Sequence, residues 1–388
     1  MQPNFAEHLA KPNKIQMGGY YTPRELVDKV YDFIQPYLIR YKKKLIIFDN
    51  AGGCGAFLSG IQKYEYRIAD YDSMACQYLK RNFDNDKIFC SNSLLDVNRL
   101  KYLIPSSSIL IMIGNPPYND TTSEFRNGEK GINLCDDDLT DRDTGISFLK
   151  SYDKLKADIV CVLHPLSYLI KEANFKRLRS FKENYHLIKG EIFSSSLFEG
   201  TGSAKFPILI ALYERNTSGM TFEHIYNFKF DVLAGNNKFT LSKYKTTDGY
   251  INKYPPRKND MQESPIGLYY YTFRDINSLK KNTSFMTIKH YNGIVVTLEN
   301  FYKYAYLYSF KNLFNPENAW LYGNISPLGN SEEIEKDKEL YILYAVKKHP
   351  IIGNMANNIL RLYGIRKNNN CDISKIENKI KKIMNRLI

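Results

Sequence analysis

The sequence predicts an α/β fold, in which a Rossmann-like, mostly parallel sheet of seven strands, one of them antiparallel, precedes a second, basic C-terminal domain. Two observations support this prediction. In the first half of the chain, short apolar runs alternate with segments long enough for a helix, the pattern of a parallel sheet with helices on both faces. After Arg215, Tyr, Lys and Asn become frequent, and residues 215–388 contain 26 Lys and Arg but only 15 Asp and Glu.

The length and charge of the chain indicate two domains with different partners. Its 388 residues exceed what one ordinary α/β core needs, so we predict domains over residues 1–214 and 215–388. Residues 1–214 are nearly neutral, with 28 basic and 26 acidic side chains, although the whole chain carries a net charge of +13. The basic second domain predicts a polyanionic partner, while a solvated basic surface without a partner is the alternative.

Cysteine spacing and apolar run lengths indicate a reduced, non-membrane protein. The six cysteines form no C-x-x-C pair and no zinc-like cluster with histidine, so we expect free thiols and no metal site. The N-terminal segment is polar and lacks the apolar core of a signal peptide. The longest apolar runs, near 109–113 and 208–212, are far too short to span a membrane. These features together predict a cytosolic protein.

The elements follow in a regular order. A helix should begin at Pro23 with Thr22 as its N-cap, because Thr22-Pro23-Arg24-Glu25 has the pattern of a capping box. Ile, Met and Leu recur at helical spacing over 373–388, which predicts a terminal helix. The last two predicted strands are joined by a loop too short for a helical crossover, so they should form an antiparallel hairpin at one edge of the sheet. The seven predicted strands are 45–48, 66–69, 87–90, 109–113, 159–163, 185–193 and 206–213.

A glycine-rich turn, Asp49-Asn50-Ala51-Gly52-Gly53-Cys54-Gly55, follows the first predicted strand. Glycines at such a turn allow backbone amides to approach a ligand closely. Asp70 ends the next strand, 21 residues after Asp49, where folds of this kind carry a carboxylate that binds ribose hydroxyls. Either feature alone could be structural, as a tight loop or a surface aspartate. Their combination favours a site for a ribose-containing cofactor.

The tetrad Asn115-Pro116-Pro117-Tyr118 follows the fourth predicted strand. An exocyclic aromatic amine is a poor nucleophile because its lone pair is delocalised into the ring. The Asn115 amide oxygen and the Pro116 carbonyl can accept its hydrogens and localise that lone pair, while the prolines fix the backbone in place. Tyr118 offers a face on which a base removed from a duplex can stack. A structural Pro-Pro turn is the alternative.

These motifs resemble those of the gamma-type adenine-N6 DNA methyltransferases over roughly residues 17–213. That family carries an upstream Tyr-Thr-Pro motif, matched here by Gly19-Tyr20-Tyr21-Thr22-Pro23, then the cofactor glycine motif, then Asn-Pro-Pro-Tyr, and finally a target recognition domain. The resemblance implies a class I methyltransferase fold and S-adenosylmethionine as cofactor. Position 50 is Asn where the family often has Pro, and Ser93 stands where it usually has an Asp that holds the cofactor adenine.

The resemblance also assigns site residues. Asn115, Pro116, Pro117 and Tyr118 would be catalytic, and Phe198 would stack on the other face of the target base, with Phe206 as its competitor. The implied cofactor contacts are Tyr21, Thr22, Pro23, Asp49, Gly53, Gly55, Asp70, Asn92 and Ser93. We further expect the acidic residues of 136–143 to form a solvated, mobile loop rather than a metal site, and His164 to be structural.

The activity implied is transfer of a methyl group from S-adenosylmethionine to N6 of adenine in a specific sequence of double-stranded DNA, with base flipping. Such an enzyme would act in restriction-modification, with a cognate restriction endonuclease as a partner, or as an orphan methyltransferase, in the prokaryotic cytosol and associated with the nucleoid. The alternatives are an amino-methyltransferase of the same fold that acts on RNA or a protein glutamine, and a DNA-binding protein with a degenerate methyltransferase fold.

Overall fold

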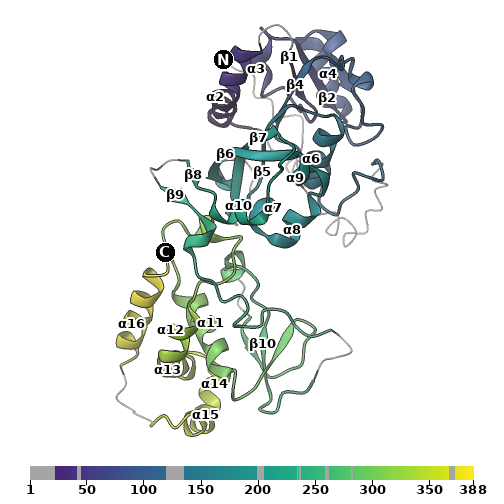
Figure 1. Cartoon of the computed structure of the whole chain (residues 1–388). Coiled ribbons are helices and arrows are strands. Elements are labelled where there is room, and N and C mark those ends of the chain that lie inside the picture. The colour runs from purple at the N-terminus through teal and green to yellow at the C-terminus, as the bar shows by residue number, and fades with distance from the viewer. Residues whose placement is uncertain are drawn as a thin grey trace. The chain divides into compact units, whose positions relative to one another are not determined.

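The structure is a computed structural model (Figure 1), which describes residues 22–41, 45–118, 135–198, 205–233, 235, 237–257, 262–280, 283–366 and 372–388. The chain forms two compact units, Met1–Leu241 and Ser242–Ile388, and each has its own sheet. Among the described helices, none is both long and apolar enough to cross a lipid bilayer.

The first unit is built on a large mixed sheet. Its strands are β1 (Leu45–Asp49), β2 (Tyr66–Asp70), β3 (Ile88–Cys90), β4 (Ile109–Gly114), β5 (Ile159–Pro165), β6 (Tyr185–Ser194), β7 (Pro207–Arg215), β8 (Phe230–Val232) and β9 (Lys238–Phe239). They lie in the order β3-β2-β1-β4-β5-β7-β6-β8-β9. β1 to β5 are mutually parallel, and β7 is antiparallel to both β5 and β6. β8 is parallel to β6, and β9 reverses again.

The predicted α/β class with a mostly parallel sheet is confirmed, and the seven predicted strands occur within two residues of their expected ends. The strand count and the place of the hairpin were wrong. In the described part of the unit, β8 and β9 extend the sheet to nine strands, two of them reversed, so the β6–β7 hairpin does not form its edge. At three and two residues, β8 and β9 are too short to carry a readable alternation of apolar and polar residues.

Helices cover both faces of this sheet. They are α2 (Arg24–Arg40), α3 (Leu58–Ile61), α4 (Ser73–Asn82), α6 (Thr144–Lys154), α7 (Ser167–Ile170), α8 (Glu172–Arg177), α9 (Ser180–Asn184) and α10 (Phe222–Asn227). α2 packs on β5 and β7, and its buried residues join a core cluster with the inward-facing residues of β1, β4 and β5. Burial on both faces explains why the central strands are continuous apolar runs.

The start of α2 differs from the predicted capping box. The helix begins at Arg24 with Pro23 in the N-cap position, and no side chain caps it. Thr22, the expected cap, is buried and its hydroxyl accepts a hydrogen bond from the Asn115 side chain instead. The sequence pattern was therefore misread because the threonine serves a tertiary contact rather than its own helix.

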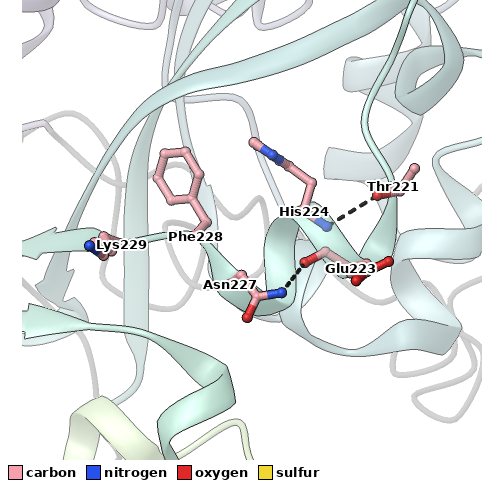
Figure 2. Close-up of a pocket in the computed structure, with 6 residues that line it drawn as sticks. All are labelled: Thr221, Glu223, His224, Asn227, Phe228 and Lys229. Carbon is pink, nitrogen blue, oxygen red and sulfur yellow. Dashed lines mark hydrogen bonds between the residues drawn. The ribbon is translucent and has the colours of Figure 1, made fainter.

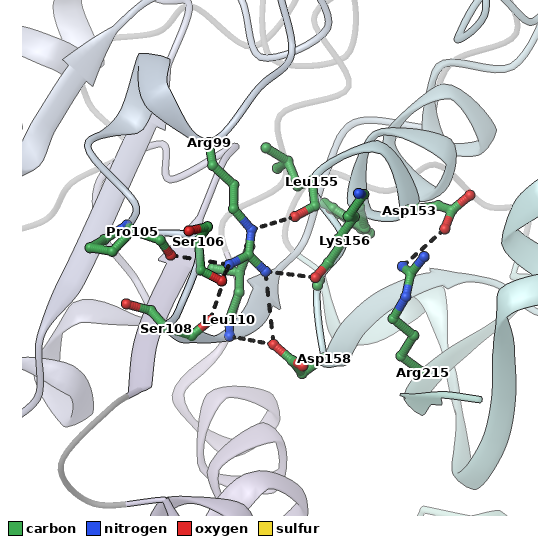
Figure 3. Close-up of polar contacts among 12 residues, drawn as sticks. Arg99, Pro105, Ser106, Ser108, Leu110, Asp153, Leu155, Lys156, Asp158 and Arg215 are labelled. Carbon is green, nitrogen blue, oxygen red and sulfur yellow. Dashed lines mark hydrogen bonds and ion pairs between the residues drawn. The ribbon is translucent and has the colours of Figure 1, made fainter. Parts of the chain in front are cut away.

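Arg99, in the segment between β3 and β4, ties together the amino-terminal ends of β4 and β5 (Figure 3). Its guanidinium donates to the backbone carbonyls of Leu155 at 2.8 Å and Lys156 at 2.7 Å. Its Nη2 also lies 3.9 Å from Oδ2 of Asp158, and that carboxylate accepts a hydrogen bond from the Leu110 backbone amide. These contacts fix the amino-terminal ends of β4 and β5 relative to each other.

The second unit combines a small antiparallel sheet with helices. Its elements are β10 (Leu268–Tyr271), β11 (Phe285–Met286), β12 (Gly293–Val296), α11 (Phe301–Leu313), α12 (Ser331–Lys336), α13 (Lys338–Lys348), α14 (Pro350–Asn354), α15 (Ala356–Leu362) and α16 (Ile373–Asn385). The tyrosines that the sequence shows among basic residues largely build its core, since Tyr270 stacks on Tyr304 and Tyr306 meets Tyr341 edge-on. The predicted terminal helix is confirmed as α16.

The two units divide after Leu241, later than the boundary predicted after residue 214. The reason is that the chain continues from β7 through α10 to β8 and β9, which extend the first sheet. The change of composition after Arg215 therefore begins within the first unit.

Candidate active site

The predicted motifs meet along one edge of the first sheet. β1 ends at Asp49, β2 at Asp70 and β4 at Gly114, and these three strands are neighbours running in the same direction. Carboxyl ends of parallel strands share one edge, which is where open α/β sheets bind ligands. The glycine turn, the acidic residue and the Asn-Pro-Pro-Tyr tetrad therefore belong to a single candidate site.

The glycine turn has the backbone geometry that glycine permits. Gly53 and Gly55 have positive φ angles of 51° and 78°. A methyl group on Gly55 would lie 2.5 Å from Leu58 Cδ1, whereas one on Gly53 would meet no described atom within 4 Å. Gly55 is thus required for packing, and Gly53 faces open space that a ligand can fill.

Asp70 holds this turn in place. Its Oδ2 accepts a hydrogen bond from the Gly53 amide at 2.7 Å, and its Oδ1 accepts one from the Asp72 amide at 2.8 Å. Asp72 caps the amino end of α4, accepting from Met74, so it does not share the role of Asp70. Burial raises the pKa of Asp70, and the two backbone amides oppose that rise. The carboxylate keeps lone pairs available for a second donor such as a ribose hydroxyl.

Asp49 links the glycine turn to the Asn-Pro-Pro-Tyr tetrad. It is only 2% exposed, and its Oδ1 accepts from the Ala51 amide at 3.2 Å. Burial, with a smaller contribution from the charge of Asp70, raises the pKa of Asp49 to about 7. Gly114, the last residue of β4, packs so closely that a Cβ there would lie 2.7 Å from Asp49 Oδ1. The two motifs consequently cannot move independently.

In the Asn115 side-chain amide, the nitrogen has a hydrogen-bond partner among the described residues and the oxygen has none. Its Nδ2 donates to Thr22 Oγ1 at 3.2 Å, which joins the upstream motif to the catalytic motif. Its Oδ1 is buried and accepts no hydrogen bond from the described residues. A buried acceptor without a donor costs about 1–3 kcal/mol, so its presence at a site needs an explanation. An incoming N–H group would provide one.

Tyr118 packs against the core beside the start of α6. A Cβ at Gly145 would lie 3.1 Å from Tyr118 Cβ and 2.5 Å from the Tyr168 hydroxyl, so only glycine fits between these two tyrosines. Tyr168 donates to Asp143, which also caps α6 by accepting from the Gly145 amide at 3.1 Å. Sequence reasoning missed Gly145 and Tyr168, since nothing in their local patterns connects them with Tyr118.

Asn92 and Ser93 lie just after β3. Asn92 Oδ1 accepts from the Leu94 amide, and its backbone oxygen accepts from Lys101 Nζ. Ser93 is only 5% exposed. Of the two residues predicted to contact the cofactor adenine, Ser93 therefore faces the protein interior, which leaves Asn92 as the better candidate.

The predicted stacking residue, Phe198, is only 2% exposed and meets Phe193 edge-on with ring centroids 5.7 Å apart. Its ring is part of the core cluster, whereas Phe206 is only partly buried against that cluster. Burial thus gives Phe198 a packing role here and makes Phe206 the more accessible of the two aromatics. Tyr21, the first predicted cofactor contact, lies outside the described residues.

In the acidic segment that follows the tetrad, Asp137 and Asp138 are exposed, as expected for a solvated loop, whereas Asp136 and Asp141 have partners within the fold. Asp136 accepts from the Asp96 and Val97 amides. Asp141 pairs with Lys150 at 3.3 Å and also with Arg177. These partners were not visible in the sequence because they come from distant segments. The described part of the chain contains no group of three His, Cys, Asp or Glu side chains arranged to hold a metal ion.

His164 is structural, as expected. It is 1% exposed, its Nε2 lies 2.7 Å from the Tyr213 hydroxyl, and its Nδ1 lies 2.9 Å from the Pro165 carbonyl. Burial lowers its pKa to about 4, so the ring is neutral near pH 7. A neutral ring that donates from Nδ1 and accepts at Nε2 satisfies both contacts.

A hollow lies beside α10 in the first unit (Figure 2). His224 of α10 stands 4.3 Å, between ring centroids, from His186 near the start of β6. Because β6 runs parallel to β5, its start lies at the sheet edge opposite the carboxyl ends of β1 and β4. This hollow is therefore separate from the candidate active site. Its lining residues are Thr221, Glu223, His224, Asn227, Phe228 and Lys229.

No protein-family model and no curated protein matches the sequence. Among solved structures, the chain is similar to a modification subunit of a putative type I restriction enzyme from Vibrio vulnificus YJ016, with 17% identity over 61% of this chain and 52% of that chain and a TM-score of 0.41. It is also similar to a putative class I S-adenosylmethionine-dependent methyltransferase from Listeria monocytogenes (16% identity, 61% and 70% of the two chains, TM-score 0.38). A type I restriction-modification methyltransferase subunit from Streptococcus thermophilus gives 16% identity over 51% and 45% of the two chains, with a TM-score of 0.35. The chain thus spans about half the length of the first of these, and its activity has to be inferred from the site itself.

Proposed function

We propose that this protein transfers the methyl group of S-adenosylmethionine to N6 of adenine in duplex DNA. The observation that carries the proposal is the Asn115 amide oxygen, which is buried at the carboxyl end of β4 without a hydrogen-bond donor among the described residues. An exocyclic amine has the N–H groups that this oxygen lacks. The adjoining glycine turn offers room for a cofactor within the same edge of the sheet.

The residues at the edge fit that cofactor. Gly53 has the positive φ and the open surroundings that permit close approach of a ligand to the backbone. Asp70 is already oriented by two backbone amides and can accept from ribose hydroxyls. Asn92, just after β3, would contact the adenine of the cofactor. When bound, S-adenosylmethionine would supply an electrophilic methyl group.

The chain's own residues would then activate the acceptor. Asn115 Oδ1 and the Pro116 carbonyl accept the two hydrogens of the amine, which localises its lone pair and directs it away from the ring plane. Thr22 fixes the Asn115 amide by accepting from Nδ2, so the acceptor oxygen is preorganised before the base arrives. The nitrogen would gain the methyl group as its bond to the cofactor sulfur breaks, which leaves a neutral thioether, and the nitrogen would lose one proton to water.

Tyr118 would hold the flipped base by stacking, with Phe206 as the second aromatic in place of the buried Phe198. Flipping costs a few kcal/mol, which stacking and the hydrogen bonds to Asn115 and Pro116 would offset. The basic residues after 215 would bind the DNA backbone. A cognate restriction endonuclease remains a predicted partner.

The decisive test is to identify whether DNA, RNA or protein accepts the methyl group. Labelled S-adenosylmethionine is incubated with the protein and, in parallel, duplex DNA, structured RNA, and ribosomal or release-factor protein. DNA that carries the label is digested to nucleosides. We expect label in N6-methyladenine from the DNA. Label confined to RNA or to glutamine in protein would overturn the proposal in favour of another amino-methyltransferase.

A calorimetric titration addresses the non-enzymatic alternative. Binding of S-adenosylmethionine, weakened in Asp70→Ala, supports an enzyme. A chain that binds duplex DNA but releases no heat with S-adenosylmethionine at any reachable concentration would instead be a DNA-binding protein with a degenerate site.

A further inference from the structure

The helix α16 has two sharply different faces. Ile376, Ile380, Ile383 and Met384 are buried where it packs on α11 and α13. Its exposed side carries Lys375, Lys379 and Lys382, and the exposed Arg386 follows as the C-cap. Lys381 is exposed as well, but it points to another side of the helix. Figure 1 shows α16 as the yellow helix that ends the second unit.

These four cations form a single line, which we call the basic stripe. Their spacings of four, three and four residues place them within about 60° of one another around a helix of 3.6 residues per turn. None of them pairs with an acidic side chain among the described residues. Glu377, the one acidic residue within α16, lies off the stripe and pairs with Lys348 at 2.8 Å.

Helix stability alone does not explain the stripe. Cations near a helix C-terminus interact favourably with the helix dipole, which accounts for Lys382 and Arg386. Lys375, however, is the third residue after the Asp372 cap, where a carboxylate would stabilise the helix and a cation opposes it. A line of like charges along the whole helix is also self-repelling. A polyanionic ligand would remove that repulsion.

We propose that the basic stripe binds the phosphate backbone of duplex DNA. This inference rests on the proposed function and adds the surface by which the second unit would hold the substrate. From Lys375 to Arg386 the stripe extends for roughly 16 Å at 1.5 Å per residue, comparable to the rise of about five nucleotides of one DNA strand. Lysine and arginine without acidic partners are the side chains that neutralise phosphates.

An anionic membrane is the competing occupant for an amphipathic basic helix. Such helices bind membranes by inserting their apolar face. In α16 that face is buried against α11 and α13, so only the charges are available. Extended phosphate chains fit this arrangement better than a lipid surface does.

The test is the salt dependence of DNA binding by the full chain. Binding of a labelled mixed-sequence duplex is measured by fluorescence anisotropy between about 50 and 200 mM salt. The stripe variant carries Lys375→Gln, Lys379→Gln, Lys382→Gln and Arg386→Gln. We expect its slope of log affinity against log salt to be shallower by about 3 to 4, roughly one for each phosphate that the variant no longer neutralises. Affinity should fall equally for all sequences.

A matched control removes four exposed lysines of the same unit that lie off the stripe, namely Lys243, Lys245, Lys336 and Lys347, each to Gln. We expect the control to change the slope by less than about one. Equal effects of the two variants would mean that bulk charge is responsible and would overturn the stripe. The stripe proposal would also be overturned if the stripe variant no longer bound phosphatidylserine vesicles but still bound DNA as wild type does.

Two further measurements distinguish failure of the stripe proposal from loss of folding and from failure of the proposed function. If the fourfold variant loses helix by circular dichroism, the single variants Lys379→Gln and Lys382→Gln replace it, each with an expected slope change of about one. Wild-type protein that methylates duplex DNA while all stripe variants bind it normally would refute the stripe and leave the proposed function standing. Wild-type protein that neither binds nor methylates duplex DNA would refute both.

Discussion

Asn115 and Thr22 are 93 residues apart in the chain, yet their side chains share a partly buried hydrogen bond. In the proposed mechanism this contact makes Thr22 a positioning residue, because Thr22 would act on the base only through Asn115. Thr22→Val keeps the shape of the side chain but removes the acceptor and leaves Nδ2 unpaired, at a cost of about 1–3 kcal/mol. We expect kcat for methyl transfer to fall by about tenfold or more.

Thr22→Ser is the matched control, since serine retains the hydroxyl and should restore most of the rate. Steady-state kinetics of both variants separate this role from packing. Equal losses in Thr22→Val and Thr22→Ser would indicate that the methyl group, and not the hydrogen bond, is what matters.

Asp49 should make stability depend on pH. Burial raises its folded-state pKa to about 7 from 3.8, so the folded chain retains a proton that the unfolded chain has already lost. Its contribution to stability is therefore full below pH 3.8 and is lost as pH rises through about 7. Urea unfolding of wild type and Asp49→Asn measures this. Between those pH values the free energy of unfolding of wild type, relative to the variant, should fall by up to about 1.4 kcal/mol per pH unit. A constant difference would contradict the buried, protonated Asp49.

At the scale of elements, Gly53 in the turn after β1 and Gly114 at the end of β4 are glycine for different reasons. Gly53→Ala meets no described atom and should cost only the left-handed backbone penalty of about 1–2 kcal/mol, while its methyl group intrudes on the cofactor. Gly114→Ala collides with Asp49 and should lower the free energy of unfolding more. Thermal unfolding and calorimetric titration with S-adenosylmethionine compare the two. If Gly53→Ala binds the cofactor as tightly as wild type, the glycine turn is not the cofactor site.

The elements also show where sequence reasoning succeeds. The seven long strands and α16 were predictable because buried runs and helical spacing leave strong local patterns. β8 and β9 were not, since two or three residues carry no period. The N-cap at Thr22 failed for another reason: its side chain takes part in a tertiary contact that overrides the local signal.

At the scale of the whole molecule, we propose that the first unit binds the cofactor and that the second unit binds the DNA backbone. Hydrogen exchange should show this division. S-adenosylmethionine should slow exchange in peptides covering 50–55, 70–72 and 114–118, because a bound ligand suppresses local opening. Duplex DNA should protect Ile373–Asn385. Protection by S-adenosylmethionine confined to Ser242–Ile388 would contradict the assignment.

The chain-wide organisation was only partly readable from the sequence. Clustering of the motifs at one sheet edge could be predicted, because each follows a parallel strand and such strands end together. The division after Leu241 could not, because charge and composition change before the first sheet is complete. The basic excess of residues 215–388 was visible, but its alignment along α16 required the exposed face of that helix to be known.

The most direct test of the central claim is single-turnover methyl transfer to duplex DNA by wild type and Asn115→Ala, with cofactor affinity measured in both. We predict that the variant binds S-adenosylmethionine within about threefold of wild type but forms N6-methyladenine at least about a hundredfold more slowly, because the acceptor for the amine hydrogens is gone. N6-methyladenine formed at the same rate by both proteins would contradict the role assigned to Asn115 and, with it, the mechanism.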